Sequence, residues 1–386
     1  MRLLIAGFPA FSSMFTVGSV GFWLSLYVQE VLGFSHSQTE ALATAYFIAL
    51  ATGSVWAGAS VDQTGKPWLF ASIGLLLNAA SITGMYLVRG FTPMLALRLV
   101  QGLGLSTSIP VALGSLSLIA GESRGVGLTS LFMSTGMALG SLVGGLIIGF
   151  AGYWALFASA SLLSLLGALV STQIRVARVT RPPSVRELAR LLSGPVLVVL
   201  LGILARQTLA TGVYALLSVY LRRLLGLTLV QTAVALTINP IVQGVLSLYV
   251  AEKSKRHASL LYPLGILLTS VVFIMLYKSS HNAPLAYAAM VLQGVSFALV
   301  NVSGNYLVIT GLPREVRYTA SSLFNFFFNV GWILGTGLTA AVFREISPLS
   351  WLPLSSAGLT VVALLVYLGL TVLRAQSPTD RPSAQA

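Results

Sequence analysis

The amino-acid sequence carries the same short pattern in both of its halves. A ten-residue pattern runs from Leu26 to Ser35 as LYVQEVLGFS and returns from Val219 to Thr228 as VYLRRLLGLT. Three more patterns return in the same order: Gln101-Gly102 as Gln293-Gly294, Gly136 and Gly140 as Gly331 and Gly335, and the cluster Asp62 to Lys66 as Glu252 to Arg256. Secondary transporters are commonly built from internal repeats that share one substrate site, so these repeats favour a duplicated membrane protein.

The composition excludes water as the main solvent of the chain. Only 8% of the residues are charged and 56% are hydrophobic, whereas about a quarter of the residues in a soluble domain are charged. The net charge of +13 does not indicate nucleic-acid binding, because the basic residues are scattered between apolar runs and form no stripe with stacking aromatic residues. We therefore expect the lipid bilayer as a partner and no nucleic acid.

The residues that usually hold metals or phosphates are scarce. There is no cysteine, and the three histidines, His36, His257 and His281, fall in predicted loops. Residues 58–67 superficially resemble a phosphate-binding loop. However, Ser60 stands at the position of its first glycine, and Pro67 replaces the Ser or Thr that holds magnesium. We predict no metal, no cofactor and no enzymatic activity.

Twelve segments are long and apolar enough to cross a membrane, for which about twenty residues are needed in a helix. They lie near 3–28, 38–60, 67–88, 92–119, 125–150, 153–173, 193–221, 228–250, 259–277, 285–310, 318–343 and 351–373. The longest polar connection follows the sixth segment. The predicted fold class is therefore an all-α membrane protein with twelve transmembrane helices, in which the parts are an N-terminal set at 1–174, a cytoplasmic linker at 175–192, a C-terminal set at 193–374 and a disordered C-terminal tail at 375–386.

The distribution of basic residues predicts the orientation of these segments. Fifteen of the 22 lysines and arginines lie on the side of the termini and the central linker, and five lie on the other side. Because Lys and Arg are enriched in cytoplasmic loops, we expect a multi-pass protein of the cell membrane with both termini in the cytoplasm.

Two short motifs resemble signatures of a known family. The sequence GASVDQTGK from Gly58 to Lys66, between spans 2 and 3, is similar to Gly-x-x-x-Asp-x-x-Gly-Arg/Lys, the first signature of the major facilitator superfamily. The sequence RLVQG from Arg98 to Gly102, in span 4, is similar to the second, Arg-x-x-Gln-Gly. The chain resembles this family over nearly its whole length, and the resemblance implies two pseudo-symmetric six-helix bundles that rock about a central cavity, lined mostly by spans 1, 4, 7 and 10.

The same resemblance implies a set of gating and coupling residues. Asp62 precedes Pro67 and can accept backbone N–H bonds at a helix start, so it is either a cytoplasmic latch or a plain helix cap. Glycines such as Gly136 and Gly140 serve helix packing, rocking of the helices, or both. Their pattern is similar to a signature of drug antiporters, but this chain has Ser141 at the position where the signature has a proline. The gating and coupling candidates are Gly58, Asp62, Gly65, Lys66, Arg98, Gln101, Gly102 and Glu252.

Arg206 is the most informative single residue, because it lies near the middle of span 7. An arginine at that depth costs about 2.5–3.5 kcal/mol on insertion scales unless it faces protein or water. All nine acidic residues lie at span ends, in loops or in the tail. Arg206 therefore faces a substrate anion, bonds to backbone carbonyls and neighbouring amides, or is turned by the helix toward a wet crevice.

Polar residues recur at a spacing of one helical turn, which places each pair on one helix face. These side chains either line a substrate cavity or tie helices together. The substrate-binding candidates are Thr16, Trp23, Arg206, Gln207, Tyr214, Asn239, Gln243, Asn301, Asn305, Asn325 and Asn329.

The function that these patterns favour is a secondary active transporter of a small organic solute, working by alternating access as a monomer. The cationic core favours an anionic or neutral solute, and protons or other ions are candidate coupling partners. The alternative is a proton-coupled multidrug efflux antiporter, which the glycines of span 5 favour. A remote alternative is a membrane receptor or assembly factor that does not transport.

Overall fold

The computed structural model describes residues 1–175, 194–215, 217, 221, 226–279, 282–313, 316–342 and 348–375. The described residues of the N-terminal half form nine elements: α1 (Arg2–Thr16), η1 (Val17–Gly21), α2 (Phe22–Leu26), η2 (Tyr27–Val31), α3 (His36–Thr64), α4 (Pro67–Leu87), α5 (Phe91–Leu105), α6 (Ser108–Ala120) and α7 (Glu122–Ser171). Those of the C-terminal half form α9 (Gly194–Ala215), α11 (Leu229–Lys278), α12 (Ala283–Thr310), α13 (Arg317–Val342) and α14 (Pro348–Ala375).

The lengths of these helices are consistent with twelve membrane spans. Among the described residues, nine helical segments are long and apolar enough to cross a membrane. Two of them, Glu122–Ser171 and Val230–Lys278, have 50 and 49 residues, which at about 1.5 Å per residue is more than twice the roughly 30 Å of the hydrocarbon core. Each of these two supplies two spans, and α13, with 26 residues, supplies the twelfth.

The two long helices each cover two predicted spans. α7 is kinked at Gly152, whose φ of 78° and ψ of −177° are outside the helical region and are open to glycine. In α11 a polar stretch, Glu252–His257, lies in the middle. The residues before it pack against α7, and those after it pack against α12 and α14. His257 is therefore an exposed residue of α11, so its predicted position in a loop is wrong.

The first span is not a regular α-helix. Two π-helical turns, η1 and η2, interrupt it, and such turns are common where a helix accommodates a close neighbour or a functional site. Gly18 in η1 allows that approach, since an added Cβ would lie 2.4 Å from the carbonyl oxygen of Met137 in α7.

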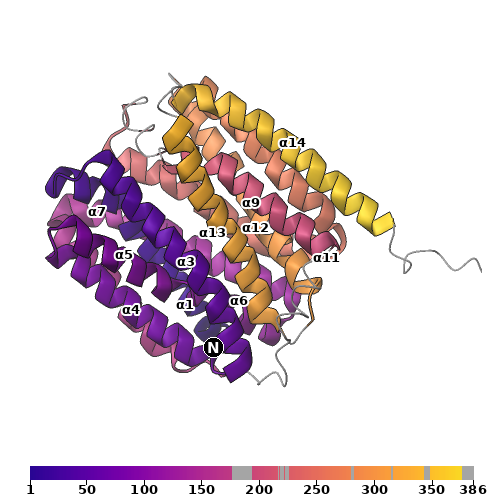
Figure 1. The fold of residues 1–386 in the computed structure, drawn as a ribbon, viewed down its shortest axis with the longest axis horizontal. Coiled ribbons are helices and arrows are strands. Elements are labelled where there is room, and N and C mark those ends of the chain that lie inside the picture. The colour runs from indigo at the N-terminus through magenta and orange to yellow at the C-terminus, as the bar shows by residue number, and fades with distance from the viewer. Residues whose placement is uncertain are drawn as a thin grey trace, which may run out of the picture.

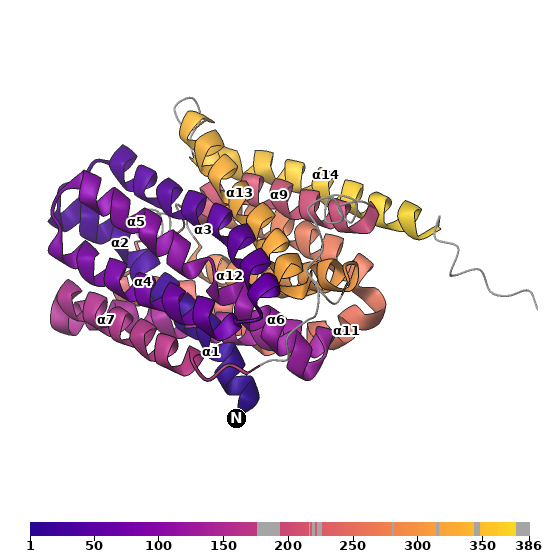
Figure 2. The ribbon, with the colours of Figure 1, turned by 60° about the horizontal axis from the view of Figure 1, so that its bottom comes forward.

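The two halves lie side by side. Figure 1 shows the N-terminal half, from indigo to magenta, beside the C-terminal half, from magenta to yellow, with α3 next to α13 along the boundary. Figure 2, turned by 60°, keeps α3 beside α13, and α7 packs against α11 as the second boundary pair. These two helix pairs connect the halves.

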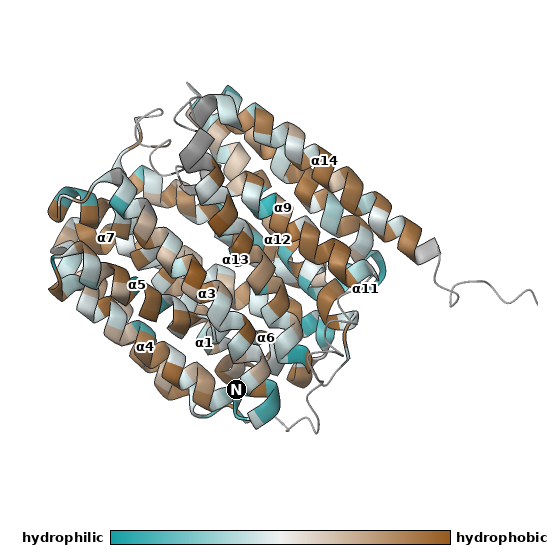
Figure 3. Ribbon diagram, in the orientation of Figure 1, coloured by the Kyte–Doolittle hydropathy of each residue, from teal (hydrophilic) through white to brown (hydrophobic). Residues whose placement is uncertain are grey.

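The hydropathy of the surface fits a bilayer. Figure 3 shows hydrophobic residues along the lengths of the helices and hydrophilic residues mostly near their ends. On α14, for example, Leu364, Leu365 and Leu368 are exposed. Exposure of such an apolar surface to water is unfavourable, whereas its contact with lipid tails is not.

Several predicted boundaries shift. Span 4 is broken at Ser106–Thr107 into α5 and α6, and α3 extends to Thr64, so that Asp62 lies on the helix instead of in the following loop. Most of the predicted linker, at 176–192, lies outside the described residues, as do His281 and the tail at 376–386.

Candidate functional site

Asp62 joins the two halves of the molecule. It lies in the last turn of α3 and is 5% exposed. Its Oδ2 accepts one hydrogen bond from the backbone N–H of Thr319 at 2.8 Å and another from the Thr319 hydroxyl at 2.5 Å. Thr319 lies in the first turn of α13, where N–H groups have no intrahelical partner and the helix dipole favours a carboxylate. Asp62 therefore caps a helix of the other half.

The cap on the next helix of the same half is not formed. α4 begins at Pro67, and the preceding residue, Lys66, makes no side-chain capping bond. Gly65 ends α3 with a φ of 64°, a left-handed conformation that glycine adopts without strain. Asp62 therefore caps α13 and not the following helix, α4, and its role as a latch stays a prediction.

The start of α13 is held from two sides. An added Cβ on Gly58 would lie 2.1 Å from Ser322 Oγ and 2.8 Å from the carbonyl oxygen of Tyr318, so only glycine lets α3 approach α13 this closely. The hydroxyl of Tyr318 shares a hydrogen bond of 3.2 Å with Ser115 of α6. The helix start therefore sits between α3 and α6 of the N-terminal half.

An ion pair crosses the same boundary. Glu122, the first residue of α7, accepts a hydrogen bond from Nη2 of Arg317, the first residue of α13. The side chain of Arg317 is 4% exposed and that of Glu122 is 29% exposed. Because Arg317 is buried, loss of Glu122 would leave its charge without a carboxylate, which is strongly destabilising.

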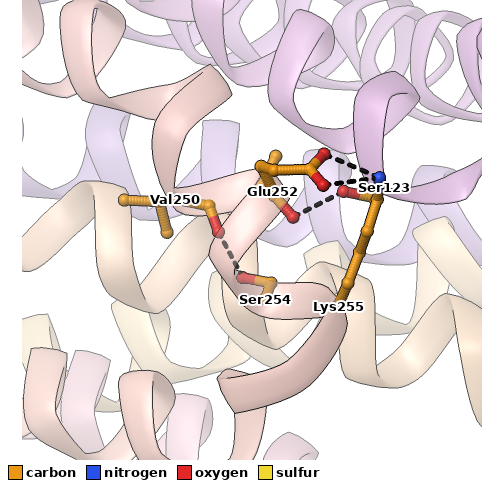
Figure 4. A network of polar contacts seen from close by, with 6 residues as sticks. Ser123, Val250, Glu252, Ser254 and Lys255 are labelled. Atoms are coloured by element: carbon orange, nitrogen blue, oxygen red, sulfur yellow. Dashed lines mark hydrogen bonds and ion pairs between the residues drawn. The ribbon is translucent and has the colours of Figure 1, made fainter.

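The duplicated counterpart of the Asp62 contact is weaker. Ser123, in the first turn of α7, donates from its hydroxyl to the carbonyl oxygen of Ala251 in α11 at 2.5 Å (Figure 4). Glu252, the repeat equivalent of Asp62, instead pairs with Lys255 one turn further along its own helix at 2.6 Å, and its side chain is 69% exposed. Among the residues that the structure describes, the predicted gating residue Glu252 thus caps no helix. We call the contacts Asp62–Thr319, Glu122–Arg317 and Ser123–Ala251 the latch.

Further hydrogen bonds join α7 to α11 away from the latch. Ser130 accepts bonds from Ser247 at 2.7 Å and from Gln243 at 3.3 Å, and Ser141 shares a bond of 3.1 Å with Thr237. The predicted substrate-binding residue Gln243 is thus a boundary contact between the halves.

Arg206 is fully buried inside the C-terminal half, at 0% exposed. Thr269 of α11 accepts from its Nε at 3.3 Å and from its Nη2 at 3.1 Å, Tyr214 accepts from Nη2 at 3.4 Å, and Gln207 accepts from Nη1. The guanidinium carbon lies 4.4 Å from the centre of the Phe297 ring of α12. All three acceptors are uncharged, so within the described part of the chain the charge of Arg206 has no counter-charge.

The N-terminal half contains a similar arrangement around Arg98 of α5. Its Nε donates to the carbonyl oxygen of Leu42 at 3.3 Å, its Nη1 donates to Gln101 at 2.5 Å, and its guanidinium lies 4.3 Å from the centre of the Tyr46 ring. Gly102 allows this packing of α5 on α3, since an added Cβ would lie 2.4 Å from the carbonyl oxygen of Tyr46. Arg98, Gln101 and Gly102 therefore tie two helices of one half together.

Aromatic rings connect the two arginine clusters across the boundary. Phe47 is 5.1 Å from Tyr46 and stacks on Trp332 of α13 at 4.8 Å with an interplanar angle of 16°. Trp332 is 6.4 Å from Tyr214, which is 5.7 Å from Phe297. The described structure thus contains a row of rings from Arg98 to Arg206, in which the Phe47–Trp332 pair is the contact between the halves.

The other predicted amides are not gathered at Arg206. Asn305 and Asn325 donate to carbonyl oxygens one turn earlier on their own helices, those of Asn301 at 2.8 Å and Ser321 at 2.9 Å. Asn329 is buried on α13, and Asn239 is half-buried on α11. Of the eleven substrate-binding candidates, the structure brings Arg206, Gln207 and Tyr214 into direct contact.

The two substrate-binding candidates of the first span, Thr16 and Trp23, lie in different surroundings. Thr16 accepts a hydrogen bond of 3.2 Å from Asn78 of α4, inside the N-terminal half. The indole of Trp23 donates to the carbonyl oxygen of Ser141 at 3.4 Å and packs near Ala233 of α11. Gly140 and Gly136 of α7 lie against the carbonyl oxygens of Phe15 and Phe11, each 2.2 Å from an added Cβ. These glycines therefore pack α7 on α1.

Several residues of this site were not singled out from the sequence. Thr319, Thr269, Phe297 and Trp332 resemble ordinary packing residues in the sequence, and only Gln293 carried a signal, as the repeat of Gln101. Within the residues that the structure describes, no group of three or more His, Cys, Asp or Glu side chains could hold a metal ion.

Comparisons with known proteins give a family and a fold. The model of the Major Facilitator Superfamily matches residues 6–336 and, in a second match, residues 258–385. The search of curated proteins finds no match, whereas 317 chains of solved structures match. One of them, the crystal structure of the human organic anion transporter MFSD10 (TETRAN), is similar with a TM-score of 0.67 at 15% identity, over 96% of this chain and 98% of that chain. At that identity the likeness concerns the fold alone.

Proposed function

The chain belongs to the major facilitator superfamily, and on this premise we propose that it is a secondary active transporter that moves a small organic anion across the membrane by alternating access. The two moving units are the bundles at 1–174 and 193–374. The charge bias of the loops supports a place in the cell membrane with both termini in the cytoplasm, which puts the latch on the cytoplasmic side.

The observation that carries the choice of an anion is the environment of Arg206. The guanidinium donates hydrogen bonds to Thr269, Tyr214 and Gln207, and none of these acceptors carries a negative charge. Of its five N–H groups, these bonds use four. An anion that reaches the remaining N–H on Nη1 gains from a charge that few other groups screen, so its interaction is much stronger than that of an exposed ion pair.

The latch supports alternating access. Its three contacts all join the halves at the end that carries Asp62, and every one of them must break before α3 and α13, or α7 and α11, can separate there. Hydrogen bonds and one ion pair break and re-form at low net cost when water replaces the lost partners. The structure therefore has the arrangement expected of a state that is closed toward the cytoplasm.

The solved relative adds a consistent, weaker argument. That relative is an organic anion transporter, which agrees with the solute class that Arg206 favours. At 15% identity the shared fold does not by itself transfer a substrate, so the proposal depends on Arg206.

Counterflow in proteoliposomes tests the proposal. The purified chain is reconstituted, the vesicles are loaded with an unlabelled organic carboxylate, and uptake of the same labelled carboxylate is measured. We expect transient accumulation of the label above the level in vesicles without protein. Exchange of a cationic dye for protons, with no counterflow of any carboxylate, would support the multidrug efflux alternative instead.

A further inference from the structure

Several polar atoms around Tyr214 are buried and have no hydrogen-bond partner among the described residues. They are the Nε2 of Gln207, both amide atoms of Gln293 and the indole Nε1 of Trp332. Gln293 is 0% exposed and lies close to the Tyr214 hydroxyl, but its amide atoms make no hydrogen bond of ordinary geometry. These three side chains come from α9, α12 and α13.

Three unpartnered buried side chains in one place are unusual, because an unmade hydrogen bond in the interior costs free energy. In each of the three at least one free group is an N–H, on Gln207, Gln293 and Trp332, and Arg206 adds the remaining N–H of Nη1. A cluster dominated by donors is matched by an acceptor without hydrogens of its own. A carboxylate has this property, since its two oxygens offer about four acceptor positions.

Aromatic side chains lie close to the same hydrogen-bond donors. The Tyr214 ring lies 5.7 Å from Phe297, 5.9 Å from Phe273 and 6.4 Å from Trp332. Phe47, from the other half, covers the face of Trp332 at 4.8 Å. Aromatic rings bind one another through offset or edge contacts beyond the gain from buried area, so this surface favours a flat ring over a saturated one of the same size.

We infer that the solute is an aromatic carboxylate and that Trp332, Gln293 and Phe47 determine this specificity. The carboxylate accepts from Arg206, Gln207, Gln293 and the indole N–H of Trp332, and the ring lies against the rings of Tyr214 and Trp332. Phe47 occupies the face of Trp332 in this structure, and it leaves when the halves rock apart, so that ring binding is coupled to the movement. This inference rests on the proposed function and narrows its substrate class.

Three matched probes test it by isothermal titration of the purified full chain. 1-Naphthoate has both ring and charge, decalin-1-carboxylate has the charge on a saturated ring of similar size, and 1-naphthamide has the ring without the charge. We expect 1-naphthoate to bind about tenfold more tightly than decalin-1-carboxylate, which is the ratio that one favourable ring contact supplies. It should bind roughly 10- to 100-fold more tightly than 1-naphthamide, which lacks the charge-assisted hydrogen bonds.

Two variants of Trp332 separate the ring from its N–H group. Trp332→Leu is expected to remove the preference for 1-naphthoate over decalin-1-carboxylate. Trp332→Phe is expected to keep that preference and to weaken the binding of both carboxylates by a similar factor, because only the donor is lost. The matched control is Trp56→Phe, since Trp56 is 64% exposed on α3 and contacts Phe70; it should bind the three probes as the native chain does.

The outcomes separate this inference from the proposed function. If decalin-1-carboxylate binds as tightly as 1-naphthoate, or if Trp332→Leu keeps the preference, the aromatic specificity is wrong while an organic anion transporter remains. If 1-naphthoate does not bind but saturated carboxylates show counterflow, the aromatic specificity is likewise wrong and the proposed anion transport remains. If no carboxylate binds or shows counterflow, the proposed function fails as well.

Discussion

Asp62 and Thr319 are separated by 257 positions in the sequence, yet the carboxylate of one caps the helix that begins beside the other. This contact uses a charge to hold a helix start of the opposite half, and it can be made only when the two halves meet at this end. Asp62 is therefore expected to control which end of the transporter is open.

Replacement of Asp62 by asparagine tests this role. Asp62→Asn keeps an acceptor for the Thr319 N–H but loses the favourable charge at the helix start, which contributes up to about 2 kcal/mol in a partly buried geometry. We expect counterflow to fall strongly while binding of a carboxylate survives. Glu252→Gln is the matched control, because Glu252 pairs only with Lys255 among the described residues, and it should transport normally. Equal rates for Asp62→Asn and the native chain would contradict the role.

Removal of one partner of the Glu122–Arg317 pair should open the same end. Glu122→Gln leaves a buried arginine without its carboxylate, for which about 3–5 kcal/mol is typical. The chain contains no cysteine, so Ser115→Cys, next to Tyr318, reports access by its labelling rate with a maleimide. We expect faster labelling in Glu122→Gln and a return toward the native rate in Glu122→Gln combined with Arg317→Gln, which removes the unpaired charge.

The close approach at Gly58 gives a steric test of the same boundary. In Gly58→Ala the new methyl would meet Ser322 Oγ and the Tyr318 carbonyl at 2.1 and 2.8 Å, so α3 and α13 must move apart. We expect slower counterflow and faster labelling at Ser115→Cys. Gly149→Ala is the control, since nothing lies within 4 Å of the added Cβ, and alanine there stabilises the helix slightly. A Gly58→Ala variant that behaves like Gly149→Ala would show that the close contact is not needed.

The orientation is tested independently of the transport cycle. Both termini are expected in the cytoplasm from the excess of basic residues on that side. A tag placed after Ala386 should therefore react with an impermeant reagent only in lysed cells. Labelling of intact cells would reverse the assignment of the latch to the cytoplasmic side.

The sequence predicts the fold more completely than the site, for a physical reason. Span length and apolar composition are local properties, so the two sets of helices follow from them. The burial of Arg206 also follows, because it lies at mid-span. Its partners Thr269 and Phe297 do not, since a small hydroxyl and a phenyl ring are equally common in ordinary helix packing.

Asp62 and Glu252 also show what the sequence alone does not predict about the site. The repeat makes the two carboxylates equivalent in the sequence, but among the described contacts only Asp62 of the two reaches across the boundary. Glu252 is followed one turn later by Lys255, and a local pair at this spacing on an exposed helix face is within easy reach. Long-range helix packing decides which of the two carboxylates reaches the start of a distant helix. Local sequence patterns do not predict this packing.

The binding of organic carboxylates to an Arg206→Gln variant tests the central claim most directly. The variant loses charge-assisted hydrogen bonds, each contributing about 1.5–3 kcal/mol, so the dissociation constant for 1-naphthoate and for decalin-1-carboxylate should rise roughly 10- to 100-fold. Arg206→Lys should restore part of the affinity, since it returns the charge without the planar fork. The melting temperature should fall little, because Thr269 keeps its bonds to Ser296 and to the Gly265 carbonyl. Unchanged affinity for both carboxylates in a folded Arg206→Gln variant would contradict the claim that this arginine binds the transported anion.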